Sequence, residues 1–172
     1  RSVLQQVGND PLVEVLVSDN ASTDETRSLV EEQQKRFKNL RYHCNEENIG
    51  AEGNTHQAIR QSRGEYVLVA GDDDYLLDGA LRVLLDNIRK YRGAALFHLQ
   101  KEDVPRRVYK DAGIVPYIAY VGYRMTWIGG AVFRRELYAG IEEPQKYDYT
   151  SLPQVYLQLE VLRKNPEFVI LY

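Results

Sequence analysis

Apolar positions along the first hundred residues follow two alternating periods. Short runs of β-branched and aromatic residues predict buried strands, and segments with apolar residues three and four positions apart predict helices. The predicted strands are residues 13–17, 40–44, 66–70 and 94–99, and the predicted helices are residues 2–7, 23–38, 51–62 and 78–91. This alternation is typical of a mostly parallel central sheet with helices on both faces, so we expect an α/β fold.

The pattern after residue 100 is less regular. Residues 101–110 are polar and are expected to form a connection, and residues 114–123 suit a helix or a strand. Residues 127–135 predict a strand entered through Gly129 and Gly130. These glycines either let a ligand approach the backbone closely or form a tight packing bend. Ser151 is expected to cap a last helix, and residues 168–172 predict a last strand.

Three consecutive carboxylates, Asp72, Asp73 and Asp74, follow the predicted strand at residues 66–70. Adjacent like charges disfavour one another's ionisation, so such a run needs either full solvation or a neutralising cation. Mg²⁺ and Mn²⁺ prefer oxygen ligands, and they bind through one or two carboxylates plus substrate phosphates. Ligands of open α/β sheets lie at the carboxyl ends of strands, which favours a metal–phosphate site here. A solvated acidic turn is the alternative.

A further carboxylate, Asp19, lies between the strand at 13–17 and the following helix, where Ser22 and Glu25 have capping-box spacing. Asp19 is well placed to accept a hydrogen bond from a ligand, although it could instead bond to its own turn. The histidines His43, His56 and His98 have no metal-ligand spacing, so they are expected at strand edges or on the surface.

The composition is that of one ordinary globular domain, residues 1–172. The chain is 44% hydrophobic and 27% charged with a formal net charge of -3, which argues against disorder and against nucleic-acid binding. No apolar stretch approaches the ~18 residues that a membrane helix needs. The single Cys44 cannot form an intramolecular disulfide, which predicts a reducing cytoplasm. Because the chain opens on Arg1 rather than Met, the lack of a targeting segment carries no weight.

The order and spacing of several segments resemble the family 2 glycosyltransferases, which have the Rossmann-like, nucleotide-binding GT-A fold. The matching segments are residues 15–26, 48–50 with Asn54, 64–66, 71–77, 128–130 and 133–135. The family's first strand, which would lie in the middle of the sheet, is absent. The resemblance therefore implies one GT-A domain truncated at its N-terminus, with residues 1–100 as the nucleotide-binding half and 101–172 as the acceptor-side half.

The resemblance implies a metal-dependent, inverting glycosyltransferase that moves a sugar from a nucleotide-diphosphate donor to a hydroxyl acceptor. Asp19 would contact the base of the donor, and Asn20 would shape that turn. Asn48 and Gly50 would belong to the same nucleotide-sugar site. Ala51-Glu52-Gly53 follow Gly50, where members of the family often carry a basic residue that assists the nucleotide. This difference leaves the identity of the donor's nucleobase open.

The same resemblance assigns roles to the acidic triplet and to a catalytic base. Asp72 would lie near the ribose, and Asp73 would ligate Mn²⁺ or Mg²⁺ bridging the diphosphate. Asp74 would hold the loop or add a ligand. Transfer also needs a base that takes the proton of the acceptor hydroxyl. Asp148, in a loop ahead of the last helix, is the candidate, and Glu142 and Glu143 are the fallbacks.

The acidic motif is similar to that of members that build bacterial surface polysaccharides, such as O-antigen or capsule. This similarity implies a glycan or lipid-linked glycan acceptor and a cytoplasmic protein, with association at the inner face of the membrane left open. Two alternatives remain. One is a non-catalytic GT-A domain used for binding. The other is a haloacid-dehalogenase-like phosphotransferase with Asp19 as nucleophile, although that class needs a second Asp where this chain has Ala21.

Overall fold

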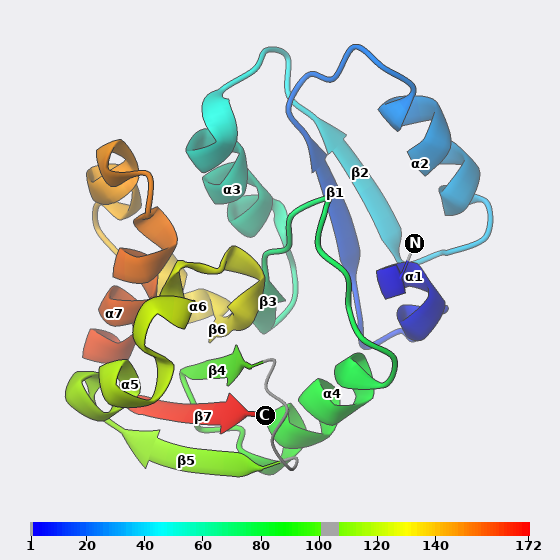
Figure 1. The fold of residues 1–172 in the computed structure, drawn as a ribbon. Coiled ribbons are helices and arrows are strands. Elements are labelled where there is room, and N and C mark those ends of the chain that lie inside the picture. Colours follow the sequence, from blue (N-terminus) through cyan, green and yellow to red (C-terminus); the bar gives the residue numbers. More distant parts are fainter. Residues whose placement is uncertain (1, 101–106) are drawn as a thin grey trace. The chain divides into compact units, whose positions relative to one another are not determined.

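The computed structural model describes residues 2–100 and 107–172, and the chain divides into two compact units (Figure 1). Unit 1 comprises Arg1–Gly64 and Tyr75–Leu81, and unit 2 comprises Glu65–Asp74 and Arg82–Tyr172. Both units combine helices with strands, which confirms the α/β class. The division into a nucleotide-binding half, residues 1–100, and an acceptor-side half, residues 101–172, concerns function and stays a prediction.

Unit 1 is built on two parallel strands whose register places Val15 opposite Leu40 and Asp19 opposite Cys44. Parallel neighbours need a crossover, and helix α2 provides it. Helix α3 packs against β1, and α2 packs against both strands. The elements are α1 (Ser2–Val7), β1 (Val15–Asp19), α2 (Thr26–Gln34), β2 (Leu40–Cys44) and α3 (Gly50–Gln61).

Helix α2 is shorter at both ends than the predicted span of residues 23–38, and the expected capping box does not form. The backbone N–H of Ser22 donates to Asp19 Oδ1 at 2.8 Å, and that of Thr26 donates to Asp24 Oδ1 at 2.9 Å. These two aspartates hold the chain in turns up to Glu25. The helix therefore starts at Thr26, with Glu25 as an N-cap that makes no side-chain hydrogen bond.

Unit 2 contains a mixed sheet with the strand order β3-β6-β4-β7-β5. Among its described strands only β4 and β7 pair in parallel, whereas β6 is antiparallel to β3 and β4, and β5 is antiparallel to β7. The expected mostly parallel arrangement is wrong for this unit, because apolar patterning identifies a strand without giving its direction. The strands are β3 (Tyr66–Leu68), β4 (Leu96–Leu99), β5 (Val108–Ala112), β6 (Ala131–Arg134) and β7 (Glu167–Leu171).

Helix α7 packs against strands β4 and β6 and against helices α5 and α6. The ambiguous segment at 114–123 is helix α5 followed by a 3₁₀ turn. Of the predicted connection at 101–110, residues 101–106 lie outside the described residues, and the part from Val108 onward belongs to the edge strand β5. The remaining elements are α4 (Ala80–Lys90), α5 (Ile114–Val121), η1 (Gly122–Thr126), η2 (Ile128–Gly130), α6 (Arg135–Ala139), η3 (Pro144–Thr150) and α7 (Pro153–Lys164).

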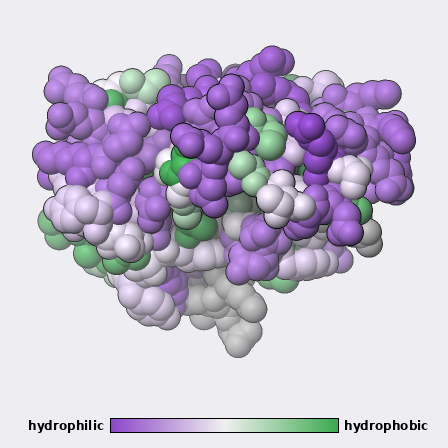
Figure 2. All heavy atoms as spheres, turned by 90° about the horizontal axis from the view of Figure 1, so that it is seen from above, coloured by the Kyte–Doolittle hydropathy of each residue, from purple (hydrophilic) through white to green (hydrophobic). Residues whose placement is uncertain are grey.

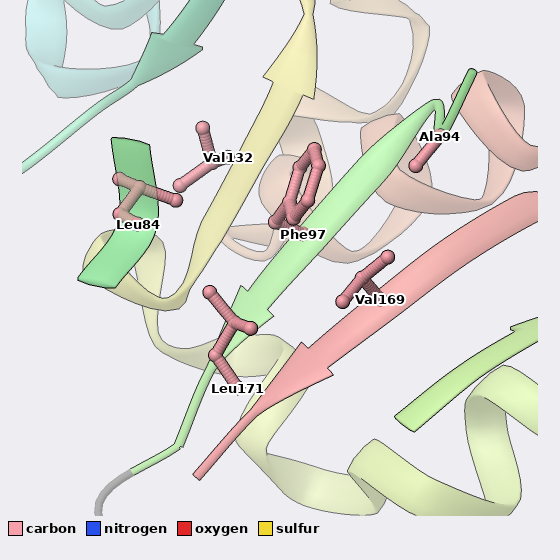
Figure 3. Packing of buried hydrophobic residues seen from close by; sticks show 6 residues of the cluster. All are labelled: Leu84, Ala94, Phe97, Val132, Val169 and Leu171. Carbon is pink, nitrogen blue, oxygen red and sulfur yellow. The ribbon is translucent and has the colours of Figure 1, made fainter. Parts of the chain in front are cut away.

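A cluster of buried apolar side chains joins α4 to the sheet of unit 2 (Figure 3). Phe97 of β4 is 0% exposed and lies between side chains of the neighbouring strands β6 and β7. Leu84 and Ile88 of α4 pack on the same cluster, which confirms the apolar stripe predicted for that helix. The buried members are Leu84, Ala94, Phe97, Val132, Val169 and Leu171.

Two expectations about polar residues are wrong. Ser151 does not cap α7, because it has a φ of 57°, and Leu152 occupies the cap position instead. His56 and His98 are not surface residues, since they are 1% and 0% exposed. His56 lies on the buried side of α3, and His98 lies in β4 at the middle of the sheet.

The surface seen from above is mostly hydrophilic, with only small apolar areas (Figure 2). Among the described residues, no helix combines the length and apolarity needed to span a bilayer.

Candidate functional site

The carboxylate of Asp19 closes strand β1 and is 4% exposed. Its Oδ1 accepts the Ser22 backbone N–H at 2.8 Å, and its Oδ2 accepts the Tyr42 hydroxyl at 2.5 Å. Hydrogen bonding from Ser22, and then from Tyr42, lowers the pKa of Asp19 below its ordinary value. Asp19 therefore satisfies its own turn, as one of the two sequence interpretations expected, and it stays ionised while doing so.

Tyr42 links Asp19 to a cation on helix α2. Its hydrogen bond to Asp19 raises the pKa of Tyr42 to about 12, so the phenol stays protonated and remains a donor. The Arg27 guanidinium lies 5.9 Å from the centroid of the Tyr42 ring. Sequence reasoning missed both residues. The position of Tyr42 in a strand parallel to β1, two residues before its end, is the signal that could have found it.

We expect Tyr42→Phe to destabilise the protein by about 1–2 kcal/mol, because it removes a donor from an ionised, nearly buried carboxylate. The same change should raise the pKa of Asp19 toward its ordinary value. Urea unfolding measures the first effect, and NMR titration of the Asp19 carboxyl measures the second. Tyr123→Phe, at a tyrosine that is 79% exposed, is the matched control. Equal stability of the two variants would contradict the prediction.

An asparagine network, made of Asn20, Asn45, Asn48 and Asn54, fixes the turns around Asp19. Asn20 Nδ2 donates to Asn48 Oδ1 at 2.9 Å and to the Gly50 carbonyl at 3.1 Å. Its Oδ1 accepts the Asn45 side-chain amide and the Ile49 backbone N–H, both at 3.0 Å. The three predicted residues Asn20, Asn48 and Gly50 are thus in direct contact.

The other end of the asparagine network connects helix α3 to strand β1. Asn54 Nδ2 donates to the Ser18 carbonyl at 3.0 Å, and Asn54 Oδ1 accepts the Ser18 hydroxyl at 2.7 Å and the Asn45 amide at 3.0 Å. Asn45 was not singled out from the sequence. Its place directly after β2, beside the end of a parallel strand, is the available signal. The network joins the loops at the carboxyl ends of β1 and β2 through side-chain hydrogen bonds.

The acidic loop, residues 71–74, follows β3 in unit 2. Asp72 and Asp73 are exposed, whereas Asp74 is partly buried. Asp74 Oδ2 accepts the Gly71 backbone N–H at 3.0 Å, and Asp74 Oδ1 accepts the indole N–H of Trp127 at 3.1 Å. A Cβ on Gly71 would lie 2.6 Å from Asp73 Oδ1, so the Asp73 carboxylate lies directly over the backbone of Gly71.

The acidic loop fits a divalent cation only when a ligand supplies further oxygens. Among the described residues, no three His, Cys, Asp or Glu side chains are grouped to hold a metal ion. Both oxygens of Asp74 already accept hydrogen bonds, which leaves the exposed carboxylates of Asp72 and Asp73 as donors. Mg²⁺ commonly binds through one or two carboxylates together with substrate phosphates, and this donor set suits that mode.

The expected catalytic base and its fallbacks lie in different surroundings within unit 2. Asp148 belongs to the 3₁₀ segment η3 and is partly buried. Glu142 and Glu143 line a cavity of about 320 Å³ between that segment and helix α7. Lys146, Arg163 and other residues complete the wall, whereas Asp148 is not part of it. The geometry does not select one of these carboxylates, so the identity of the catalytic base stays a prediction.

Curated proteins with similar sequences include bacterial sugar transferases. The GalNAc(5)-diNAcBac-PP-undecaprenol beta-1,3-glucosyltransferase of Campylobacter jejuni is 39% identical over 74 residues, which are 42% of this chain and 24% of that protein. The abequosyltransferase RfbV of Salmonella typhimurium is 22% identical over 176 residues, with 87% of this chain and 51% of that protein covered. The chain thus spans about half the length, or less, of these relatives.

Solved structures and a family profile give the fold and the family. Residues 1–349 of TarS from Staphylococcus aureus, crystallised in complex with UDP-GlcNAc, match 98% of this chain and 50% of that chain, with a TM-score of 0.72. At 19% identity this likeness shows the GT-A fold alone. The profile of Glycosyl transferase family 2 matches residues 1–141, most of the chain. The chain therefore belongs to Glycosyl transferase family 2.

Proposed function

We propose that the protein is a metal-dependent, inverting glycosyltransferase that moves a sugar from a nucleotide-diphosphate donor to a hydroxyl acceptor. The observation that carries the proposal is the acidic loop, in which a held Asp74 leaves Asp72 and Asp73 exposed at the end of a strand. Membership of the family supplies the reaction class. The known relatives are named for sugar transfer, which supports the same activity here.

The donor is proposed to bind through its base at the Asp19 turn and through its ribose at Asp72. A carboxylate has about four acceptor positions, and Asp19 uses two of them within the protein, so an N–H of a nucleobase can still be accepted. The low pKa of Asp19 keeps it an acceptor at neutral pH. The asparagine network supports the proposal by holding this turn, Asn48 and Gly50 in one arrangement.

The leaving nucleoside diphosphate accumulates negative charge during transfer. Mg²⁺ or Mn²⁺ held at Asp73, with Asp72 beside it, would neutralise that charge as a Lewis acid. The position of the Asp73 carboxylate over the backbone of Gly71 supports this role for Asp73. A cation held there would stabilise the leaving group without proton transfer to it.

The acceptor hydroxyl must lose a proton as it attacks the anomeric carbon from the face opposite the leaving group. Asp148 is the proposed base, with Glu142 and Glu143 as alternatives. The cavity that both glutamates line supports them, because a hydroxyl group could approach a carboxylate there. Asp148→Asn and Glu143→Gln, compared at saturating donor, separate the candidates by which one removes turnover without weakening donor binding.

The acceptor is proposed to be a glycan or a lipid-linked glycan of a bacterial surface polysaccharide, reached from the cytoplasm at the inner face of the membrane. The Campylobacter relative is named for an undecaprenol-linked glycan, which supports a lipid-linked glycan as the acceptor. A phosphotransferase with Asp19 as nucleophile is disfavoured, because this chain has Ala21 where that class needs a second Asp.

The experiment is a turnover assay with UDP-, GDP-, CDP- and dTDP-sugars, in Mn²⁺ and in EDTA, with the full chain. We expect release of one nucleoside diphosphate only with metal, and NMR of the product should show an anomeric configuration opposite to that of the donor. Metal-dependent donor binding without any turnover would instead favour a non-catalytic binding domain. Equal turnover in EDTA would contradict the metal requirement.

A further inference from the structure

Trp127 contacts the acidic loop from a distant part of the chain. Its indole N–H donates to Asp74 Oδ1 at 3.1 Å, although the two residues are 53 positions apart. The other oxygen of Asp74 accepts the Gly71 N–H at 3.0 Å, so Asp74 ties the start of the loop to the Trp127 segment. The side chain that could have been a third metal ligand is engaged in holding the loop.

The segment that carries Trp127 is itself anchored to helix α7. Gln154 Nε2 donates to the Thr126 carbonyl at 2.7 Å, and Gln158 Nε2 donates to the Met125 carbonyl at 2.9 Å. Gln158 is 2% exposed and also accepts the buried Tyr117 hydroxyl at 2.5 Å. The indole is therefore presented from a fixed support, whereas Asp72 and Asp73 on the loop are exposed.

The glycines after Trp127 make this contact sterically feasible. A Cβ on Gly129 would lie 2.7 Å from Asp74 Oδ2, closer than real side-chain carbons approach, and at a tight 3.1 Å from the Trp127 ring. Of the two interpretations of the paired glycines, the structure supports the packing bend, because protein side chains fill the space over Gly129. The approach is made by the carboxylate that holds the acidic loop.

We propose that Trp127 is a positioning residue for the cation and diphosphate site, acting through Asp74, and that Asp74 holds the loop rather than ligating the cation. The inference rests on the proposed function, since it assumes a cation at Asp73. The hydrogen bond from Trp127 and the bare Cα of Gly129 keep Asp74 folded back on Gly71. Asp72 and Asp73 are then presented in one arrangement before any ligand arrives.

The test uses Mn²⁺ with inorganic pyrophosphate as probe, because this pair needs no knowledge of the nucleobase. The signal of free Mn²⁺ in electron paramagnetic resonance gives the affinity for wild type and variants. We expect Trp127→Phe, which keeps an aromatic ring but removes the donor, to weaken Mn²⁺ binding roughly tenfold or more. Tyr123→Phe, at an exposed aromatic residue nearby in sequence, is the matched control and should bind as wild type does.

A second variant keeps the tryptophan and disturbs only its partner. Gly129→Ala places a methyl group against Asp74 and should also weaken Mn²⁺ binding, with a shifted indole emission. Trp127 is the single tryptophan of the chain, so its fluorescence reports the site directly. In the wild type, Mn²⁺ should quench it saturably, and diamagnetic Mg²⁺ should reverse the quenching by competition. Circular dichroism confirms that each variant is folded.

Asp73→Asn separates this inference from the proposed function. If Asp73→Asn loses Mn²⁺ binding while Trp127→Phe and Gly129→Ala bind normally, the positioning role is wrong and the metal site stands. If Asp73→Asn binds Mn²⁺ as wild type does, the proposed metal site itself is wrong. Loss of binding in all three variants, with Tyr123→Phe unaffected, supports both.

Discussion

The substitution Asp73→Asn will reduce the rate of sugar transfer roughly thousandfold and leave the melting temperature of the protein unchanged. The substitution keeps the shape of the side chain but removes the charge that would hold a cation against the diphosphate, and losing one such electrostatic contact typically costs two to three orders of magnitude in rate. Asp73 is exposed, so its replacement disturbs no packing. The measurement is nucleoside diphosphate release at saturating donor and Mn²⁺, with a thermal melt of the same sample.

The matched control is Asp86→Asn, which removes an exposed carboxylate from helix α4 in the same unit. It should retain wild-type turnover, because its only described ion pair is with Arg89 on the protein surface. If Asp73→Asn transfers sugar within a few fold of the control, the leaving group does not depend on Asp73, and the proposed mechanism is wrong.

The second large effect is a pH dependence of stability that originates at His98. This side chain is 0% exposed, and neither ring nitrogen has a hydrogen-bond partner among the described residues. Burial lowers the pKa of His98 to about 4. The unfolded chain binds a proton near the ordinary pKa of about 6.5. Between these two values the unfolded state holds more protons than the folded state.

The free energy of unfolding therefore falls as the pH is lowered through this range. The contribution of His98 to the free energy of unfolding is fully present above pH 6.5 and is lost as the pH falls toward 4, by roughly 3 kcal/mol in total. His98→Phe fills similar space with a ring that cannot be protonated. We expect its stability, measured by urea unfolding from pH 7.5 to 4.5, to fall less steeply than that of the wild type. Parallel pH profiles for the two proteins would contradict the assignment.

The sequence predicted those parts of the fold and of the site that depend on residues close together in the chain. Strand β2 spans the predicted residues 40–44, where Leu40, Tyr42 and Cys44 alternate with polar residues and turn residues follow. Asn20 and Asn48, which the family resemblance assigned to one site, are in contact because both follow parallel strands that end at the same edge. The placement of the acidic loop after β3 is likewise a local feature of the sequence.

The parts that sequence did not predict depend on contacts between distant residues. Nothing near Trp127 indicates that its N–H meets Asp74, because that contact requires the antiparallel pairing of β6 with β3. His98 has the neighbours of an ordinary strand, and only the central place of β4 in the sheet buries it. The Asp19 turn is a mixed case, because the turn itself was predictable but the Tyr42 hydrogen bond to Asp19 was not.

The central claim is that the protein binds a nucleotide-diphosphate donor through a cation held at Asp73. Calorimetric titration of the full chain with the donor identified by turnover, once in Mn²⁺ and once in EDTA, tests this claim most directly. The account predicts saturable binding in Mn²⁺ that disappears in EDTA and in Asp73→Asn. Donor binding of equal affinity with and without the metal would contradict it.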